Sequence, residues 1–268
     1  MDYFDKAETW DRATLETVQL ARLKTTIQQA SRAPFYAKRL AEAGVSADNL
    51  RSLEDIRRIP FTSKDDLRSQ YPYGLATVPH SEFVRMHCSS GTTGTPVAVC
   101  YTQSDINSWA DLMARCLYMA GVRKDDVFQN MSGYGLFTGG LGIHFGAERL
   151  GCMTIPAGAG NSKRQLKLVK DFGTTVAHIL PSYALHLGTT LIEEGEDPKA
   201  LSLRIACVGA EPYTEETRRR IEALFDMKVY NSYGLSEMNG PGVAFECQYQ
   251  NGLHLWEDAY LMEIIDPN

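Results

Sequence analysis

The sequence predicts an α/β fold, in which a mostly parallel sheet flanked by helices follows a helical front segment. From about residue 81, short apolar segments alternate with helical patterns, and this alternation indicates βαβ crossovers. Before that point the apolar residues follow helical spacing alone. We therefore expect a helical N-terminal segment, 1–80, packed on an α/β core, 81–268.

The front segment is predicted to be helical over 9–43, where apolar residues recur at roughly helical spacing. They are Leu15, Val18, Leu20, Leu23 and Ile27. Pro34 interrupts the pattern, and Gly44 is a typical end for it. Ser52 and Ser63 predict two further helix starts.

The core is predicted to alternate between strands and helices. The expected strands are 83–87, 97–101, 127–131, 154–156, 176–180, 204–208 and 228–231. The expected helices are 102–120, 140–150, 162–172, 181–194 and 214–225. A last strand is expected at 260–265, and because no closing element follows it, we expect the chain to be part of a longer protein. Ligands of parallel sheets bind beyond the carboxyl ends of the strands, so residues at those ends are the candidate site residues.

Composition and charge exclude several classes of protein. The net charge is −6 and the isoelectric point about 5.6, which argues against a nucleic-acid partner. No apolar run approaches the roughly 18 residues of a membrane span, and the N-terminus does not resemble a signal peptide. The six cysteines are dispersed without a CxxC pair, as in reduced thiol proteins. We expect a cytoplasmic protein with no membrane partner.

A run of small and hydroxyl-bearing residues lies between the first two expected strands of the core. It comprises Ser89, Ser90, Gly91, Thr92, Thr93 and Gly94. Glycines let backbone N–H groups approach a ligand closely, and the hydroxyls add donors without bulk, so this loop can wrap a nucleotide phosphate. An ordinary hairpin turn has a similar composition and stays open as the alternative.

Two later strands are followed by residues suited to a nucleotide. These residues are Gly209, Ala210, Glu211 and Pro212 after one strand, and Ser232, Tyr233, Gly234, Ser236 and Glu237 after the other. Small residues at a strand end leave room for a flat ring, on which Tyr233 can stack. The carboxylate of Glu237 suits Mg²⁺, which prefers oxygen ligands. Each segment is also compatible with a plain strand-to-helix turn.

Taken together, these three segments resemble the nucleotide-binding motifs of adenylate-forming acyl-CoA synthetases. Stretches at 59–68, 133–142, 240–244 and 252–258 are similar to the phenylacetate–CoA ligase branch, and the resemblance covers the whole chain. It implies the large N-terminal domain of such an enzyme, with the small C-terminal domain missing, and suggests a homodimer.

The resemblance implies that phenylacetate, or a similar aryl or small carboxylic acid, is activated with ATP and Mg²⁺ to an acyl-adenylate and then transferred to coenzyme A. The loop 89–94 would hold the pyrophosphate end of ATP, and 209–212 with Tyr233 would frame the adenine. Ser232 and Gly234 would belong to the same nucleotide site. Ser236 would contact the α-phosphate, and Glu237 would hold Mg²⁺.

The sequence departs from the family pattern at Thr95, where members often carry a lysine, and in ending before the domain that bears the catalytic lysine. We therefore expect this chain alone to bind nucleotide weakly and to have little ligase activity. Two alternative functions stay open. One is an adenylating enzyme with an acceptor other than coenzyme A, and the other is a nucleotide-binding relative without catalysis.

Two further groups of residues are candidates for ligand or metal binding. The acyl pocket is assigned to Tyr134 and Phe137, with Gly139 and Gly140 allowing close approach; a glycine-rich helix start with core aromatics is the alternative. Cys247 and His254 flank a predicted hairpin and could form half of a Zn²⁺ site, although a free thiol and a turn histidine are the favoured interpretation. The remaining candidate histidines are interpreted as packing residues, namely His144, His178 and His186.

Alanine in place of Tyr134 and Phe137 is expected to weaken binding of the acid more than binding of ATP, because the two rings would wall the acid. Dissociation constants measured separately for the two ligands check this. Equal losses for acid and ATP would contradict the pocket assignment.

Overall fold

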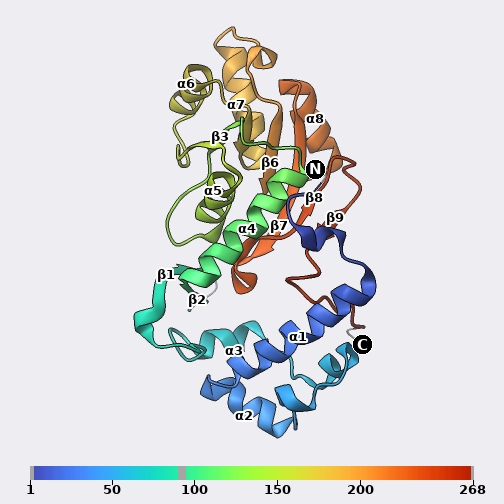
Figure 1. Cartoon of the computed structure of the whole chain (residues 1–268). Coiled ribbons are helices and arrows are strands. Elements are labelled where there is room, and N and C mark those ends of the chain that lie inside the picture. Colours follow the sequence, from blue (N-terminus) through green and yellow to red (C-terminus); the bar gives the residue numbers. More distant parts are fainter. Residues whose placement is uncertain (1–2, 90–94, 267–268) are drawn as a thin grey trace. The chain divides into compact units, whose positions relative to one another are not determined.

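The computed structural model describes residues 3–89 and 95–266 and divides the chain into two compact units (Figure 1). The core unit is built from Ile106–Leu255. The front unit is built from Asp5–Asp105 and the segment that begins at Trp256. The division into units therefore places the first strand pair with the N-terminal helices. The sequence pattern, in contrast, changes from helical spacing to alternating strands and helices near residue 81.

The core unit contains a seven-stranded sheet in the order β4-β3-β5-β6-β7-β8-β9. The pairs from β4 to β7 are parallel, and β8 and β9 are added antiparallel at one edge. The strands are β3 (Val127–Asn130), β4 (Met153–Ile155), β5 (Val176–His178), β6 (Ile205–Gly209), β7 (Lys228–Leu235), β8 (Gly240–Glu246) and β9 (Leu253–Leu255). The predicted α/β fold with a mostly parallel sheet is confirmed.

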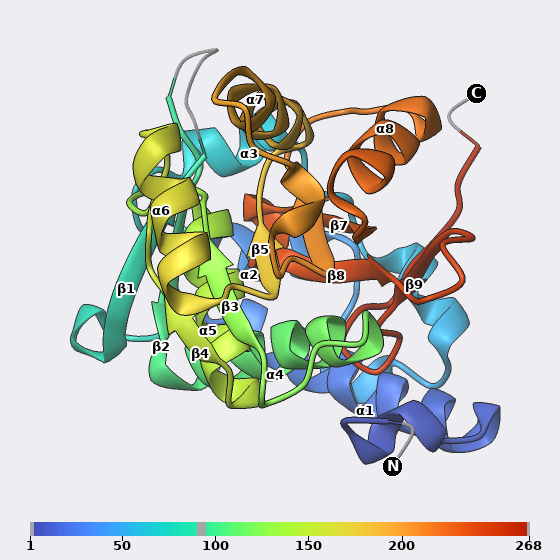
Figure 2. The same ribbon diagram turned by 90° about the horizontal axis from the view of Figure 1, so that it is seen from above.

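Helices cover both faces of this sheet, with α6, α7 and α8 on one side and α4 and α5 on the other (Figure 2). They are α4 (Gln103–Met119), α5 (Thr138–Leu150), α6 (Ser162–Phe172), α7 (Pro181–Glu193) and α8 (Glu215–Phe225). Local signals set their ends. Asn161 and Thr214 accept hydrogen bonds from the first turns of α6 and α8, and Gly151 ends α5 with a left-handed φ of 94°.

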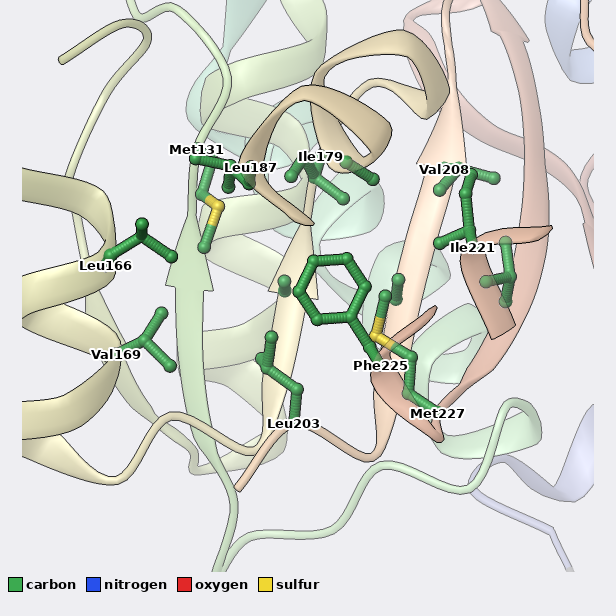
Figure 3. Packing of buried hydrophobic residues seen from close by; sticks show 14 of the residues in the cluster. Met131, Leu166, Val169, Ile179, Leu187, Leu203, Val208, Ile221, Phe225 and Met227 are labelled. Carbon is green, nitrogen blue, oxygen red and sulfur yellow. The ribbon is translucent and has the colours of Figure 1, made fainter. Parts of the chain in front are cut away.

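The main hydrophobic core lies between the sheet and helices α6, α7 and α8 (Figure 3). Strand alternation directs Ala206 and Val208 of β6 into this cluster, while Ile205 and Cys207 are buried on the other face. From the helices come fully buried side chains such as Leu191 and Ile221. Burial of each such side chain contributes roughly 1.5–3 kcal/mol to folding.

A buried ion pair joins α8 to β8. Arg218 donates to both carboxylate oxygens of Glu246, over 2.8 and 2.7 Å, and the backbone N–H of Asn231 donates to the same carboxylate over 2.7 Å. Burial alone would lower the pKa of Arg218, but the bonded Glu246 carboxylate raises it. The pair therefore places two full charges in the interior with their hydrogen-bonding capacity largely satisfied.

The front unit contains short helices and one antiparallel hairpin. Its helices are α1 (Arg12–Ala30), α2 (Pro34–Glu42) and α3 (Lys64–Ser69), and its strands are β1 (Phe83–Cys88) and β2 (Ala98–Thr102). Short 3₁₀ turns connect them: η1 (Lys6–Thr9), η2 (Ala47–Asn49), η3 (Leu53–Arg58) and η4 (His80–Glu82). Two others, η5 (Pro198–Ala200) and η6 (Ser236–Met238), belong to the core unit. Pro34 begins α2 and Ser63 caps α3, as the sequence predicts.

Two strand predictions differ from the structure. Residues 260–265, expected as a strand, have no regular structure, and Ile264 is 97% exposed; alternation alone does not form a strand that has no partner. β7 continues to Leu235, beyond the predicted end at residue 231, because it pairs with β8 through Gly234 and Leu235. In the described part of the chain, no helix is long and apolar enough to cross a membrane.

The core cluster predicts a contrast between two isoleucines on neighbouring helices. Ile221→Ala is expected to lower the free energy of unfolding by about 2–5 kcal/mol, because its side chain is fully buried. Ile192→Ala on α7, where the side chain is 56% exposed, should change it by less than about 0.5 kcal/mol. Urea unfolding measures the free energy of unfolding of both variants. Equal losses would contradict the assignment of Ile221, and not Ile192, to the hydrophobic core.

Candidate active site

Three adjacent cavities lie at the carboxyl edge of the parallel strands in the core unit. The outer cavity, of about 450 Å³, lies between the ends of β6 and β7. The central cavity measures about 220 Å³ and the inner cavity about 660 Å³. Ala210 lines all three, so they form one cleft along this edge. This is the place where open α/β sheets bind ligands.

The outer cavity is shaped by the segment that leaves β6. Gly209 pairs with Ser232 of β7, and a Cβ on Gly209 would lie 2.5 Å from the Ser232 carbonyl oxygen. Ala210 adopts a left-handed φ of 65°, which turns the chain away from the sheet. On the other side Tyr233 is about half exposed and lines the same cavity. The result is a slot between a small-residue turn and an aromatic ring.

Glu211 lines this slot, and its carboxylate is held by hydrogen bonds within the protein. Its carboxylate accepts hydrogen bonds from the backbone N–H of Ser182, over 2.7 Å, and from the Ser182 hydroxyl, over 3.1 Å. Ser182 belongs to the first turn of α7, where the backbone N–H groups carry partial positive charge. Glu211 therefore ties the β6 turn to α7, while Pro212 lines the outer cavity beside it.

The predicted residues in the last part of β7 and in η6 separate into two groups. Ser232, Gly234 and Ser236 line the central cavity. Gly234 passes so close to the backbone at Gly240 that a Cβ would overlap its carbonyl oxygen. Glu237 lies in η6 directly after Ser236 and is not among the described residues that line these three cavities.

The predicted acyl-pocket residues are also divided by the structure. Phe137, about half exposed, and Gly139 line the central cavity. The Tyr134 hydroxyl instead lies 3.0 Å from Nδ1 of His144, and the ring lines none of the three cavities. Gly140 is buried against the Gly133 carbonyl, so its lack of a side chain serves packing within the protein.

A buried polar group that sequence reasoning assigned to packing faces the central cavity. His178, at the end of β5, lines this cavity, and its Nδ1 lies 2.9 Å from Oδ1 of Asn130 at the end of β3. Burial lowers the pKa of His178 from 6.5 to about 4. The only sequence signal for it is its position at a carboxyl strand end, because its partner is 48 residues away.

The inner cavity was not predicted. It is lined by Leu180, Tyr183 and His186 of the β5–α7 connection and helix, together with residues from the β3 end. His186 Nε2 lies 3.1 Å from the Ser162 hydroxyl, which is also 3.3 Å from the Tyr183 hydroxyl. Tyr183 follows the expected strand 176–180 by three residues, and this position was the one sequence signal that could have indicated the inner cavity.

The predicted phosphate loop is described only at its start. Ser89 belongs to the front unit, where its hydroxyl accepts a hydrogen bond from the Val97 N–H over 2.9 Å and so closes the base of the loop. Ser90, Gly91, Thr92, Thr93 and Gly94 lie outside the described residues. Their role stays a prediction.

The predicted Zn²⁺ half-site also stays a prediction. Cys247 follows β8 as a partly buried free thiol, and His254 in β9 pairs with Phe245. Across residues 3–89 and 95–266, no group of three or more His, Cys, Asp or Glu side chains is placed to hold a metal ion.

The lowered pKa of His178 predicts a specific pH dependence of stability. The unfolded chain binds a proton at this residue below about 6.5 and the folded chain only below about 4, so stability falls as pH falls between these values. From pH 7 to pH 5 the wild type should lose about 2 kcal/mol more than His178→Leu.

The matched control for this prediction is His186→Leu, which removes an exposed histidine in place of the buried one. Urea unfolding at both pH values measures the difference. A wild type and a His178→Leu variant with parallel pH profiles would contradict the buried, neutral state of His178.

Comparison with known proteins places the chain in a family. The model of the AMP-binding enzyme family matches residues 13–260. Curated phenylacetate-coenzyme A ligases are similar along the chain: that of Pseudomonas putida is 48% identical over 98% of this chain, and that of Thermus thermophilus is 46% identical over 100% of it. The chain spans about 60% of the length of these relatives.

Solved structures of 2-hydroxyisobutyryl-CoA ligase have the same fold. In complex with 2-HIB-AMP and CoA in the thioesterification state, that enzyme matches with a TM-score of 0.89 at 31% identity, over 96% of this chain and 57% of its own. In the postadenylation state the TM-score is 0.91 at 30% identity, and the match covers 100% of this chain and 58% of that enzyme's chain. The chain thus belongs to the family of AMP-binding enzymes.

Proposed function

We propose that this chain provides the nucleotide- and acid-binding part of an AMP-forming acid–CoA ligase of the phenylacetate type. The observation that carries the proposal is the cleft at the carboxyl edge, where an outer slot for a flat ring adjoins a small central cavity through Ala210. Similarity to the phenylacetate-coenzyme A ligases along the chain supports it.

The outer cavity is assigned to adenine. The β6 turn from Gly209 to Pro212 offers backbone and small side chains on one side, and Tyr233 offers an aromatic face on the other. The central cavity is assigned to the acyl group, with Phe137 and Leu235 as apolar walls. The boundary between the two cavities, at Ala210 and Ser232, is then where the carboxylate meets the α-phosphate.

The proposed reaction has two steps. A carboxylate oxygen of the acid attacks the α-phosphorus of ATP, and pyrophosphate leaves. The sulfur of coenzyme A then attacks the acyl carbonyl of the adenylate, loses its proton, and AMP leaves. The cleft contributes mainly by holding the reacting groups in position, because fixed orientation removes much of the entropic cost of each step.

Mg²⁺ belongs to this proposal through the residues that would hold it. Glu237 offers a carboxylate directly after the hydroxyl of Ser236, and such hard oxygen donors suit this ion. When bound, Mg²⁺ would offset the negative charge that develops on the leaving pyrophosphate. Ser236, which lines the central cavity, would donate a hydrogen bond to the α-phosphate.

Release of pyrophosphate from ATP by the complete gene product, across a panel of aryl and small acids, tests the proposed function. Release that depends on an acid, followed by thioester formation with coenzyme A, is the expected result. Acid-dependent release without thioester would favour a different acceptor. No release with any acid would favour a nucleotide-binding protein without catalysis. The expected homodimer, the Zn²⁺ site and the cytoplasmic location stay predictions beside this proposal.

Glu237→Gln is expected to lower the rate of acid-dependent pyrophosphate release by about 100-fold at saturating ATP, because the neutral amide is a poor ligand for Mg²⁺. The rate should recover in part at high Mg²⁺ concentration. Glu216→Gln, at an exposed position in α8, is the matched control and should act as the wild type. A Glu237→Gln variant with unchanged Mg²⁺ dependence would refute the assignment.

A further inference from the structure

The hydrogen bonds of Asn130 fix which way its side-chain amide points. One end of the amide lies 2.7 Å from the Gly140 carbonyl oxygen, which can only accept, so this end is the Nδ2 donor. The other end lies 3.1 Å from the backbone N–H of Ser132, which can only donate, so it is the Oδ1 acceptor. Both partners therefore require the same orientation.

The orientation of Asn130 in turn fixes the proton on His178. Nδ1 of the imidazole lies 2.9 Å from Oδ1 of Asn130, and because that oxygen accepts, Nδ1 must carry the hydrogen. In a neutral imidazole the other nitrogen, Nε2, is then a hydrogen-bond acceptor. Burial of the ring, which lowers its pKa to about 4, keeps it neutral near pH 7.

Because Asn130 occupies Nδ1, Nε2 is the ring nitrogen left to meet a ligand in the central cavity that His178 lines. His178 is about nine-tenths buried and lines this cavity, while its Nδ1 is occupied by Asn130. Within residues 3–89 and 95–266 the side chain makes no other hydrogen bond. The cavity around it is lined by the apolar side chains of Phe137, Leu235 and Pro241 and by hydroxyl-bearing residues, namely Ser132, Thr138, Ser232 and Ser236. A buried acceptor in such surroundings favours a ligand that brings a donor.

A carboxylate or phosphate oxygen brings no proton to share with Nε2, whereas a hydroxyl group does. We propose that His178 is a specificity-determining residue, and that the acid activated by this protein carries a hydroxyl group on the part of the acyl chain that enters the central cavity. This inference rests on the proposed function, since it needs the acyl group in that cavity.

The test compares stable mimics of the acyl-adenylate, in which a sulfamoyl group replaces the phosphate. The probes are the phenylacetyl mimic and its 2-hydroxy-2-phenylacetyl and 4-hydroxyphenylacetyl counterparts, titrated into the complete gene product by calorimetry. At least one hydroxylated mimic should bind about 5- to 10-fold more tightly than the parent, the effect of one net hydrogen bond. If neither does, the inference is overturned while the proposed function stands.

Substitutions identify the group responsible. His178→Leu should bring the dissociation constants of the hydroxylated and parent mimics to a ratio of about 1, because the acceptor for the hydroxyl is lost. His178→Gln, whose side-chain oxygen can still accept, should restore part of the preference. His80→Leu, at an exposed position in the front unit, is the matched control. A preference that persists in His178→Leu would overturn the assignment.

Nitrogen NMR of the wild type gives a readout independent of affinity. Free protein should show the proton on Nδ1 of His178, and the hydroxylated mimic should shift the Nε2 resonance toward the position of a hydrogen-bonded acceptor. A proton on Nε2 would contradict the inference. Failure of all three mimics to bind would instead refute the proposed function, and this inference with it.

Discussion

The register between β6 and β7 is the constraint on which the cleft depends. Gly209 pairs with Ser232, and the carbonyl of Ser232 leaves no space for a Cβ on its partner. Since the pair is parallel, both strands run toward the same edge, and the residues that follow β6 lie opposite residues of the last part of β7 across the outer cavity. Backbone hydrogen bonds therefore bring two distant stretches of sequence together. This close approach of the two backbones requires a small residue such as Gly209 at the end of β6.

The same edge has to accept an anion in the proposed function, and two carboxylates of the core unit, Glu211 and Glu246, are engaged by the protein itself. Glu211 accepts two hydrogen bonds from Ser182 at the positive end of α7. Glu246, beyond the neighbouring strands, is neutralised by Arg218. Each carboxylate thus stabilises a connection between elements, and repulsion of a bound phosphate is reduced.

The sequence predicted the parts of the structure that local patterns determine. Helical spacing and end signals located α5, α6, α7 and α8 to within about two residues, and short apolar runs located the parallel strands. It failed where the outcome depends on a partner strand. Residues 260–265 alternate like a strand but have none beside them, and β7 is longer than predicted because β8 pairs with its end. The hydroxyl of Tyr134 lies 3.0 Å from His144, a contact that no local pattern reveals, and its assignment to the acyl pocket stays a prediction.

The cleft also divides its proposed tasks between different strands. The outer cavity is made by the ends of β6 and β7, whose small residues are required by the close approach of two backbones. The inner side of the central cavity is made by residues at and beyond the ends of β3 and β5, through Ser132, Phe137 and His178. The size of these side chains is not limited by the close approach of the β6 and β7 backbones. Other residues at these three positions would therefore leave the β6–β7 register undisturbed. In the proposed function, such a division would let the acid change while the nucleotide is kept, and the choice of acid would depend on positions such as His178 that no local motif marks.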